Sequence, residues 1–477
     1  MAISPVLDIA RRALLAQESA LGVVGHNIAN VNTPGYTRQR PDLVAERGEP
    51  SSGGVLIGTG VRLRAVVQVI DPLLARRRLH AETGAGGETT RRDQLGALAE
   101  ALNDLAQPSL AGAVDGFFDA ADALARNPGG LAERQTLLGR ASAVAVALNQ
   151  RGAAVANLQR AADDRLVAGV RDVNGLLDRI AALNREIGTT EVSGQQANDL
   201  RDSRQALLND LAGKLAITAV TDERGTVTVS SAAGPVLVAD GDVVHTLATR
   251  TRSGGLDGAV LHDLGLADAV GGFLDVPAVF TSGTLGGLAG VRDGELVTAS
   301  EHLDLVAGAL RDAVNAIQTD AAARDLGGNG TAATPLFAGL GAKDLVVAIT
   351  DPRLLAAARS TQPGDNQNAL RLADLRTAAP LTAAPASAAA LALGNSPLSQ
   401  YLATELGRVG EDAGAASDRA AASTLFTKQL EAQRASLSGV NLNEELTDLL
   451  KYQRAFQAVA QVLNVANTML DELVRVV

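Results

Sequence analysis

The side chains that most often perform chemistry in proteins are few and scattered in this sequence. Its histidines show neither zincin spacing nor a shared four-residue helical step. The absence of cysteine excludes a disulfide framework and a thiolate metal site. No nucleophile elbow, phosphate-binding loop or dinucleotide fingerprint occurs. We therefore expect no catalytic residue, no metal and no cofactor, and we expect all five histidines to be structural: His26, His80, His245, His262 and His302.

Neighbouring carboxylates offer no pair for general acid–base catalysis. Asp163-Asp164 and Glu444-Glu445 lie in segments with helical spacing. Adjacent residues of a helix point about 100° apart, so these acids do not converge on one substrate. The acids of residues 263–275 lack the spacing of a calcium loop. The chain is therefore not expected to be an enzyme.

Composition indicates a large, mainly helical protein. The 477 residues are 46% hydrophobic but only 2% aromatic, so small aliphatic side chains must fill the core. Such side chains suit helices that pack closely. The net charge of −11 gives no basic footprint for nucleic acid. We find no uncharged apolar stretch of about 20 residues that could span a membrane and no general secretory signal.

The first helix is expected at residues 4–29. Ser4 is a candidate N-cap and Pro5 fits the first helical position. Apolar residues recur in a heptad pattern, which Gln17 interrupts once. Heptad spacing is typical of a coiled-coil seam, although a helix packed on its own domain would show the same spacing. The N-terminal seam consists of Leu7, Ala10, Leu14, Leu21, Val24 and Ile28.

The last helix carries a longer heptad seam. It should begin after a break at Ser438-Gly439, with Asn441 as its cap and Glu444 three residues on. Its seam consists of Leu449, Tyr452, Phe456, Val459, Leu463, Ala466, Leu470 and Leu473. A lone helix of this kind is marginal in water. The two terminal helices can therefore pair with each other or with copies in neighbouring subunits, and assembly through the ends is expected.

The middle of the chain predicts a mainly α fold with a β-rich insert, an α+β class. A short helix is expected at residues 71–82. Helical spacing continues over residues 91–215 with breaks near 127–130 and 191–194, and residues 144–187 are expected to form one long helix. Strand signals lie at residues 61–69, 217–220, 226–229, 236–238 and 345–349. Residues 377–390 indicate a loop. The expected domains are terminal helices at 1–40 and 440–477, a helical body with short strands at 41–215 and 300–439, and a β-rich outer insert at 216–299.

One segment after the first helix resembles a known family. Residues 26–36 look like the N-terminal signature of flagellar rod, hook and hook-associated proteins, and Pro34-Gly35 there predicts a type II turn. Later segments of the hook-associated members at the hook–filament junction are similar to residues 198–208, to residues 283–293, and to residues 438–445 with 452–458. Residues 364–369 are a weaker match of the same kind. The signature residues are Asn27, Asn30, Asn32, Thr33, Pro34, Gly35 and Tyr36.

This resemblance implies a structural subunit that joins the hook to the filament. It implies export of the unfolded chain through the flagellar export apparatus, and a cytoplasmic chaperone on the C-terminal seam before export. The implied partners outside the cell are copies of the chain, the hook protein and the adjacent hook-associated protein, with no nucleic acid and no membrane. The implied location is the extracellular flagellum, after a transient cytoplasmic stage.

Three alternatives remain open on the sequence. A rod or hook subunit would share the signature, but the later segments argue against it. A wall-cutting hydrolase would need a convergent acid pair, which the sequence does not offer. A cytoplasmic coiled-coil binding protein would leave residues 30–36 unexplained.

Overall fold

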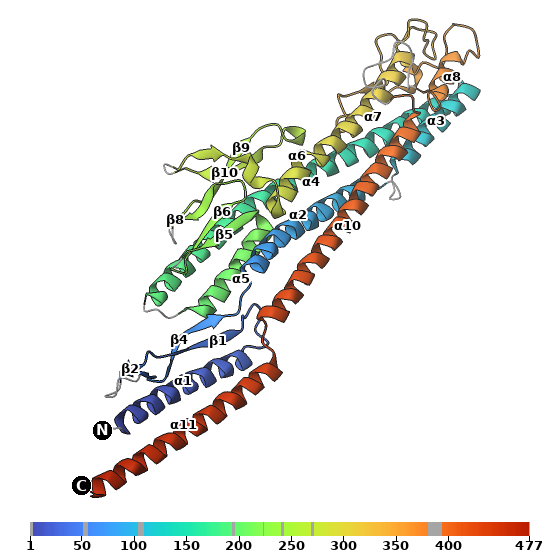
Figure 1. Cartoon of the computed structure of the whole chain (residues 1–477). Helices are drawn as coiled ribbons and strands as arrows, with labels where there is room; N and C mark the ends of the chain where they lie inside the picture. Colours follow the sequence, from blue (N-terminus) through green and yellow to red (C-terminus); the bar gives the residue numbers. More distant parts are fainter. Residues whose placement is uncertain are drawn as a thin grey trace.

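The molecule is an elongated bundle of long helices with both chain ends at the same extremity (Figure 1). The computed structural model describes residues 3–50, 56–103, 109–192, 196–222, 224–239, 243–268, 271–379 and 394–476. Most of the loop expected at residues 377–390 lies outside these ranges. We call α1, β1–β4 and α11 the base, and we call the elements from α2 to α10 the body.

Long helices build the body around α4. The helix α4 has 61 residues and is therefore about 90 Å long. It continues through Gly169, where an added Cβ would lie 2.6 Å from Leu285 Cδ2, so the glycine makes room for α6. The helices of the chain are α1 (Ile3–Ala29), α2 (Pro72–Leu102), α3 (Leu110–Arg126), α4 (Leu131–Glu191), α5 (Asn198–Lys214), α6 (Gly283–Asp293), α7 (Glu295–Gln318), α8 (Gln367–Asp374), α10 (Leu398–Ser438) and α11 (Leu442–Val476).

Two expectations about helix boundaries are wrong. The helices expected at residues 71–82 and from residue 91 are one helix, α2, which runs through four glycines. An added Cβ at Gly86 would lie 2.0 Å from Gly213 O of α5, so the close packing of these two helices requires a glycine there. The candidate cap Ser4 lies inside α1, which already begins at Ile3.

Short antiparallel strands form separate small sheets. In the base, β1 (Gln39–Ala45) pairs with β4 (Val61–Gln68), and β2 (Glu49–Pro50) pairs with β3 (Leu56–Ile57). In the insert, four strands form one sheet in chain order: β5 (Ile217–Thr221), β6 (Val227–Ser231), β7 (Val236–Ala239) and β8 (Val243–Val244). A second insert sheet has the order β11 (Phe273–Asp275), β10 (Leu261–Ala267) and β9 (Leu247–Arg252). Near α7, β12 (Phe337–Ala338) pairs with β13 (Val346–Val347).

The prediction of a mainly helical fold with a β-rich insert is confirmed. The strands of the insert end at Asp275, and α6 follows within residues 216–299. The inner residues of β5–β7, β9 and β10 share one buried apolar cluster with α4, α5 and α6. A second cluster surrounds the other half of α4, where α2, α3, α7, α8 and α10 pack. The insert is therefore built onto the body and shares its core.

A buried ionic group attaches the insert to α4. His262 Nδ1 of β10 lies 2.7 Å from Asp163 Oδ2, and Arg292 donates to Asp163 Oδ1 at 2.6 Å. Burial alone would raise the pKa of Asp163, but the hydrogen bonds from His262 and Arg292 lower it overall. This histidine has the structural role expected from the sequence, and Asp163 turns away from its neighbour Asp164 toward the insert.

Gly439 separates α10 from α11. An added Cβ at this position would lie 2.2 Å from Ala435 O, so the bend between the helices requires glycine. After the bend, Asn441 Oδ1 accepts a hydrogen bond from Asn443 N at 3.0 Å and caps α11. Among the described residues, no helix is long and apolar enough to cross a membrane.

Candidate assembly site at the paired termini

The two terminal helices pack side by side and form most of the base (Figure 1). In α11, all seven seam positions from Leu449 to Leu470 are buried or half-buried. Residues on the outer side of the helix, such as Gln461 and Thr468, are exposed. The side chain of Leu473 lies outside the described part of the chain. The heptad seam of α11 therefore coincides with the face that packs in the base.

In α1, the packed surface is broader than the expected seam. Ala10 and Val24 of the seam are buried. The other seam positions, Leu7, Leu14, Leu21 and Ile28, are half-buried. The most buried positions also include residues outside the seam: Ala16, Ala20, Val23 and Asn27. This helix packs against β1 and β4 as well as α11, and two packing partners require two faces.

Pairing leaves one apolar flank of α11 uncovered. Val462, Val465 and Met469 are 49%, 59% and 52% exposed. In the heptad pattern they lie on one side of the seam residues Leu463, Ala466 and Leu470. The apolar surface of this half of α11 is therefore wider than one neighbouring helix covers.

The signature segment after α1 folds into a closed turn. Tyr36 N donates to Thr33 O at 3.2 Å, and Gly35 between them has φ of +82°. A type II turn requires a positive φ at this position, which glycine adopts without strain. Thr33 Oγ1 donates to Asn30 Oδ1 at 3.1 Å. Asn32 and Pro34 are exposed.

Asn27 is the central side chain of the signature. Its Oδ1 accepts from Tyr36 Oη at 2.8 Å and from Gln39 N at 3.0 Å. Its Nδ2 donates to Gln39 O at 2.8 Å and to Glu445 Oε2 of α11 at 3.0 Å. Both donors and both acceptor positions of this buried amide are thus used. The signature therefore joins α1, β1 and α11 through one residue.

Arg38 extends this network along α11. It forms ion pairs with Glu444, with Glu445 at 2.6 Å, and with Asp448 at 3.7 Å. Burial alone would lower the pKa of Arg38, but Glu444 and Glu445 raise it overall. Glu444 was expected to complete a capping box with Asn441, and its carboxylate instead faces Arg38. Arg38 therefore holds the first two turns of α11 against the segment that joins α1 to β1.

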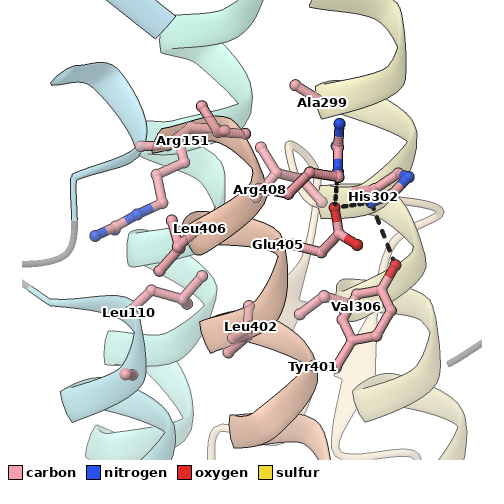
Figure 2. Close-up of a pocket in the computed structure, with 14 residues that line it drawn as sticks. Leu110, Arg151, Ala299, His302, Val306, Tyr401, Leu402, Glu405, Leu406 and Arg408 are labelled. Carbon is pink, nitrogen blue, oxygen red and sulfur yellow. Dashed lines mark hydrogen bonds and ion pairs between the residues drawn. The ribbon is translucent and has the colours of Figure 1, made fainter. Parts of the chain in front are cut away.

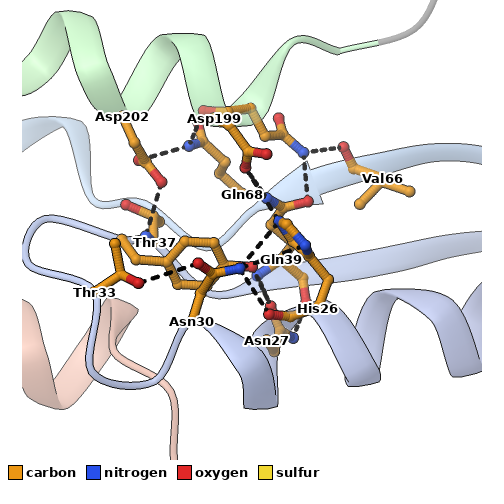
Figure 3. Close-up of polar contacts among 12 residues, drawn as sticks. His26, Asn27, Asn30, Thr33, Thr37, Gln39, Val66, Gln68, Asp199 and Asp202 are labelled. Atoms are coloured by element: carbon orange, nitrogen blue, oxygen red, sulfur yellow. Dashed lines mark hydrogen bonds and ion pairs between the residues drawn. The ribbon is translucent and has the colours of Figure 1, made fainter.

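The same segment contacts α5 of the body (Figure 3). Thr37 N donates to Asp202 Oδ2 at 2.9 Å, and Gln39 Nε2 donates to Asp199 Oδ1 at 3.0 Å. His26 Nε2 lies 3.3 Å from the same oxygen of Asp199. Burial raises the pKa of Tyr36, and Asp199 is the next contributor. The phenol therefore stays protonated and remains a donor to Asn27.

A cleft of about 520 Å³ lies between α1 and the start of α5. Ser19, His26 and Asp199 all line it, and these are the residue types of a serine hydrolase. They do not form a triad, because Ser19 and His26 are seven residues apart on one helix, about 10 Å. Ser19 Oγ instead donates to Leu15 O at 2.8 Å. The polar groups of the cleft connect the base to the body and offer no activated nucleophile.

A second, smaller cavity of about 40 Å³ lies where α10 packs on α7 (Figure 2). His302 Nδ1 lies 2.5 Å from Glu405 Oε2 and 3.3 Å from the hydroxyl of Tyr401. Arg408 Nε donates to the same Glu405 oxygen at 3.0 Å. This volume holds only a few water molecules. The group therefore fastens α10 to α7. No set of three metal-ligating side chains occurs in the described ranges.

Sequence reasoning missed the residues that follow the signature. Thr37, Arg38 and Gln39 are buried and make most of the contacts between the segments. The only sequence feature that could have pointed to these three residues is their position directly after the turn. Asp199 and Asp202 fall in a segment that carried a resemblance but had no expected role. Their contacts join parts of the chain that a single sequence does not place together.

This fold and these sites define an elongated structural subunit whose chain ends pair at one extremity. The family described as the flagellar hook-associated protein FlgK helical domain matches residues 95–337. The flagella basal body rod protein family matches residues 7–37. The C-terminal family of the flagellar basal body rod FlgEFG proteins matches residues 428–476. Both ends of the chain and its body thus match flagellar families.

Full-length relatives agree with these matches. The chain is 26% identical to flagellar hook-associated protein 1 of Bacillus subtilis, over 98% of this chain and 97% of that protein. It is 25% identical to flagellar hook-associated protein 1 of Salmonella typhimurium, over 99% and 100%. The structure of the flagellar hook junction protein FlgK from Burkholderia pseudomallei matches with a TM-score of 0.63 and 15% identity. That match covers 76% of this chain and all of the other, and it shows a shared fold.

The chain belongs to the flagellar hook-associated protein FlgK family, because the helical-domain family matches more than half of it. It is accordingly a structural protein of the bacterial flagellum. The family resemblance inferred from the signature and the later segments is confirmed.

Proposed function

We propose that this chain is a subunit of the hook–filament junction and that it acts by assembling, without catalysis. The observation that carries the proposal is the exposed apolar flank of α11 at Val462, Val465 and Met469. A helix that is apolar on two sides requires a second neighbour beside its first. Covering the exposed part of each side chain would gain about 1 kcal/mol. The second neighbour is a terminal helix of another copy.

The position in the flagellum follows from the relatives. Two are named hook-associated protein 1, and a third is named a hook junction protein. The partners of this chain are then further copies, the hook protein on one side and the adjacent hook-associated protein on the other. Its working location is outside the cell. The lack of an activated nucleophile in the large cleft supports a structural role without enzymatic activity.

Export precedes assembly in this proposal. The chain leaves the cytoplasm unfolded through the flagellar export apparatus, and a cytoplasmic chaperone covers the seam of α11 until then. In a dilute monomer both ends are mobile, since Ala466 is the only fully buried residue among the described seam positions of α11. Strong protection from hydrogen exchange across Leu7 to Ile28 in the monomer would contradict this.

Substitutions in the seam of α11 test whether the chain assembles through this helix. Leu463→Asp with Leu470→Asp places two charges in the packed face of α11. We expect chaperone capture and junction assembly to be lost, while the body unfolds at the temperature of the unmodified protein. The matched control is Gln461→Asp with Thr468→Asp, which adds the same charges to the exposed side of the same helix. Normal junctions from the seam variant would refute assembly through this helix.

A deletion strain separates the junction from the other axial positions. Cells that lack the chain should build hooks and release filament protein into the medium. Cells that build no hook would instead assign the chain to the rod or the hook. Restoring the full chain should restore filaments in the first case.

A further inference from the structure

One leucine of the body, in the loop between β12 and β13, lies almost fully in solvent. Leu340 is 88% exposed, more than any other large apolar side chain in the described ranges. A single exposed leucine is ordinary on a protein surface. This one differs because the backbone on both sides of it is held in place, so the side chain is displayed rigidly.

The carboxylate of Asp344 closes the loop from within. Its Oδ1 accepts from Leu340 N at 2.9 Å and from Gly341 N at 2.8 Å. Gly339 has φ of +118°, and an added Cβ there would lie 2.4 Å from Asp344 O. Only glycine fits such a position without strain. The loop therefore presents Leu340 in one direction.

Two neighbouring helices fasten the same loop to the body. Asp304 Oδ1 of α7 accepts from Ala342 N at 2.7 Å, and Arg311 of α7 donates to Gly339 O at 2.7 Å. Asn149 of α4 donates to Ala342 O at 2.7 Å. A group that is held in its bound position in advance loses little conformational entropy when a partner covers it. The leucine is therefore suited to anchor a partner.

The cavity where α10 packs on α7 has a matching size (Figure 2). Its volume of about 40 Å³ holds about three waters, which occupy about as much space as the four carbons of a leucine side chain. An apolar group gains affinity when it displaces poorly held water. Most of the cavity wall is apolar and includes Leu102, Leu110, Leu303, Val306, Leu402 and Leu406.

Leu340 and the cavity lie on opposite sides of the body. On α7, His302 lines the cavity, whereas Asp304, two residues on, holds the loop. On α4, Arg151 lines the cavity, and Asn149, again two residues away, holds the loop. Residues two apart on a helix point about 160° apart. The leucine therefore cannot reach the cavity of its own chain.

The two features lie at nearly the same height along the body. The cavity is lined by α7 residues between 299 and 306, and the loop is held by α7 residues between 304 and 311. The centres of these ranges are five residues apart, which is about 8 Å along the helix axis. Two copies that stand side by side with parallel long axes can therefore bring the leucine of one to the cavity of the other.

Charge favours the same pairing. Burial raises the pKa of Asp304, and the three other carboxylates beside the loop raise it further: Asp344, Asp257 and Glu301. Lys343 pairs with only one of them. The cavity is lined by two arginines, Arg151 and Arg408, against the single carboxylate of Glu405. An excess of negative charge beside the leucine thus matches an excess of positive charge at the cavity.

We propose that Leu340 of each copy enters the cavity between α7 and α10 of the next copy. A copy offers the leucine on one side and the cavity on the other, so the contact is heterologous and successive copies form a ring or a tube. This interface rests on the proposed assembly of copies, and it adds a contact between bodies to the contact at α11.

The absence of cysteine allows cross-linking in assembled flagella. Cells carry the chain with Leu340→Cys and Leu406→Cys, since Leu406 lines the cavity. Isolated hooks with filaments are treated with a short bismaleimide and dissociated, and the products are separated by size. We expect a ladder of dimers, trimers and larger species, because each copy is linked to two neighbours. Each single substitution should give monomers only.

The matched control is Leu274→Cys with Leu406→Cys. Leu274 of β11 is an exposed leucine outside the loop, and this pair should also give monomers only. Junctions that hold filaments but give no ladder with Leu340→Cys and Leu406→Cys overturn the contact and leave assembly through α11 intact. Failure of the proposed function is recognised separately, because cells that lack the chain would then build no hook.

Co-expression covers the case in which the doubly substituted chain builds no junctions. Chains with Leu340→Cys alone and chains with Leu406→Cys alone are then produced together. Each copy has one reactive position, so we expect cross-linked dimers and no larger species. The absence of dimers from filament-bearing cells likewise overturns the contact.

A charge at the leucine measures what the contact contributes. Leu340→Asp changes a side chain that lies in solvent, so the body should unfold at the temperature of the unmodified protein. Cells with Leu340→Asp should lose their filaments at lower shear than cells with Leu274→Asp, the same change on the insert. Equal retention of filaments by the two strains would contradict an interface at Leu340.

Discussion

Arg38 Nε and Glu445 Oε1 lie 2.6 Å apart, and their side chains are only 7% and 2% exposed. The pair links the strand after the first helix to the first turn of the last helix. Asn27 donates to the other oxygen of the same carboxylate at 3.0 Å. Charges removed from water are tolerated when partners surround them. The ends of this chain are therefore joined by a buried polar contact in addition to their apolar seams.

Glu445 should contribute far more to the base than its neighbour Glu444, although both pair with Arg38. Glu445→Ala leaves a buried guanidinium and Asn27 short of a partner, which should cost about 3–5 kcal/mol. The Glu444 side chain is 56% exposed, and Glu444→Ala should cost at most about 1 kcal/mol. The loss of stability in each variant can be measured by hydrogen exchange of α11 in assembled material. Equal losses of protection would show that burial does not distinguish the two pairs.

Asn27→Asp should destabilise the base although it changes few atoms. The new carboxylate cannot donate to Gln39 O, and it would face the carboxylate of Glu445. A buried pair of like charges that has lost the two hydrogen bonds donated by the Asn27 amide should cost about 3–5 kcal/mol. Asn32→Asp is the control, because Asn32 belongs to the same signature but is exposed.

Secretion and assembly should respond differently to this change. We expect the Asn27→Asp protein to reach the medium, because export of an unfolded chain does not require the folded network. It should not enter junctions, whereas the Asn32→Asp protein should enter them normally. Asn27→Asp protein retained inside the cell would show instead that the signature is read during export.

Asp320 should make part of the body sensitive to acid. The backbone N–H of Ala322 is the largest contributor that lowers the pKa of Asp320 to about 2, and Arg359 and Arg371 add to it against the effect of burial. Because the folded pKa lies below the unfolded value of 3.8, the stabilisation is complete above that value and is lost as the pH falls toward 2.

Thermal unfolding at several pH values tests this expectation. The unmodified protein should unfold at a higher temperature than Asp320→Asn from neutral pH down to about pH 4, and the difference should vanish near pH 2. Asp374→Asn, at an exposed position in α8, should follow the unmodified protein throughout. A difference between the unmodified protein and Asp320→Asn that stays constant to pH 2 would exclude the titration of Asp320 as its cause.

The sequence was informative where a pattern is local. The seam of α11 is visible because large apolar residues recur every seven positions from Leu449 to Leu470. The packed face of α1 was harder to predict, because Ala16 and Ala20 are small residues in an alanine-rich chain and carry little signal. The continuity of α2 was missed because one of its glycines, Gly86, is explained by close packing against α5, a helix that lies far away in the sequence.

The polar contacts between distant segments of the chain could not be predicted from one sequence. Arg38 and Glu445 lie at opposite ends of the chain, and nothing in either segment specifies the other. The same holds for Thr37 with Asp202 and for Gln39 with Asn198. Periodicity reports which face of a helix packs, whereas the pairing of polar side chains depends on the register between elements. The structure supplies that register.

The flank of α11 separates pairing within the chain from assembly between chains. Val462→Asp with Met469→Asp changes side chains that are about half exposed while α1 and α11 are paired. We expect no effect before assembly, so hydrogen exchange of α1 and α11 in the dilute monomer, where both ends are mobile, should be as fast as in the unmodified protein. Junction assembly should fail, because the charges occupy the surface proposed for a neighbouring copy. The control with Asp at Gln461 and Thr468 should assemble. If the flank variant builds normal junctions, the neighbouring copy does not cover this surface, and the exposed apolar residues of α11 require another explanation.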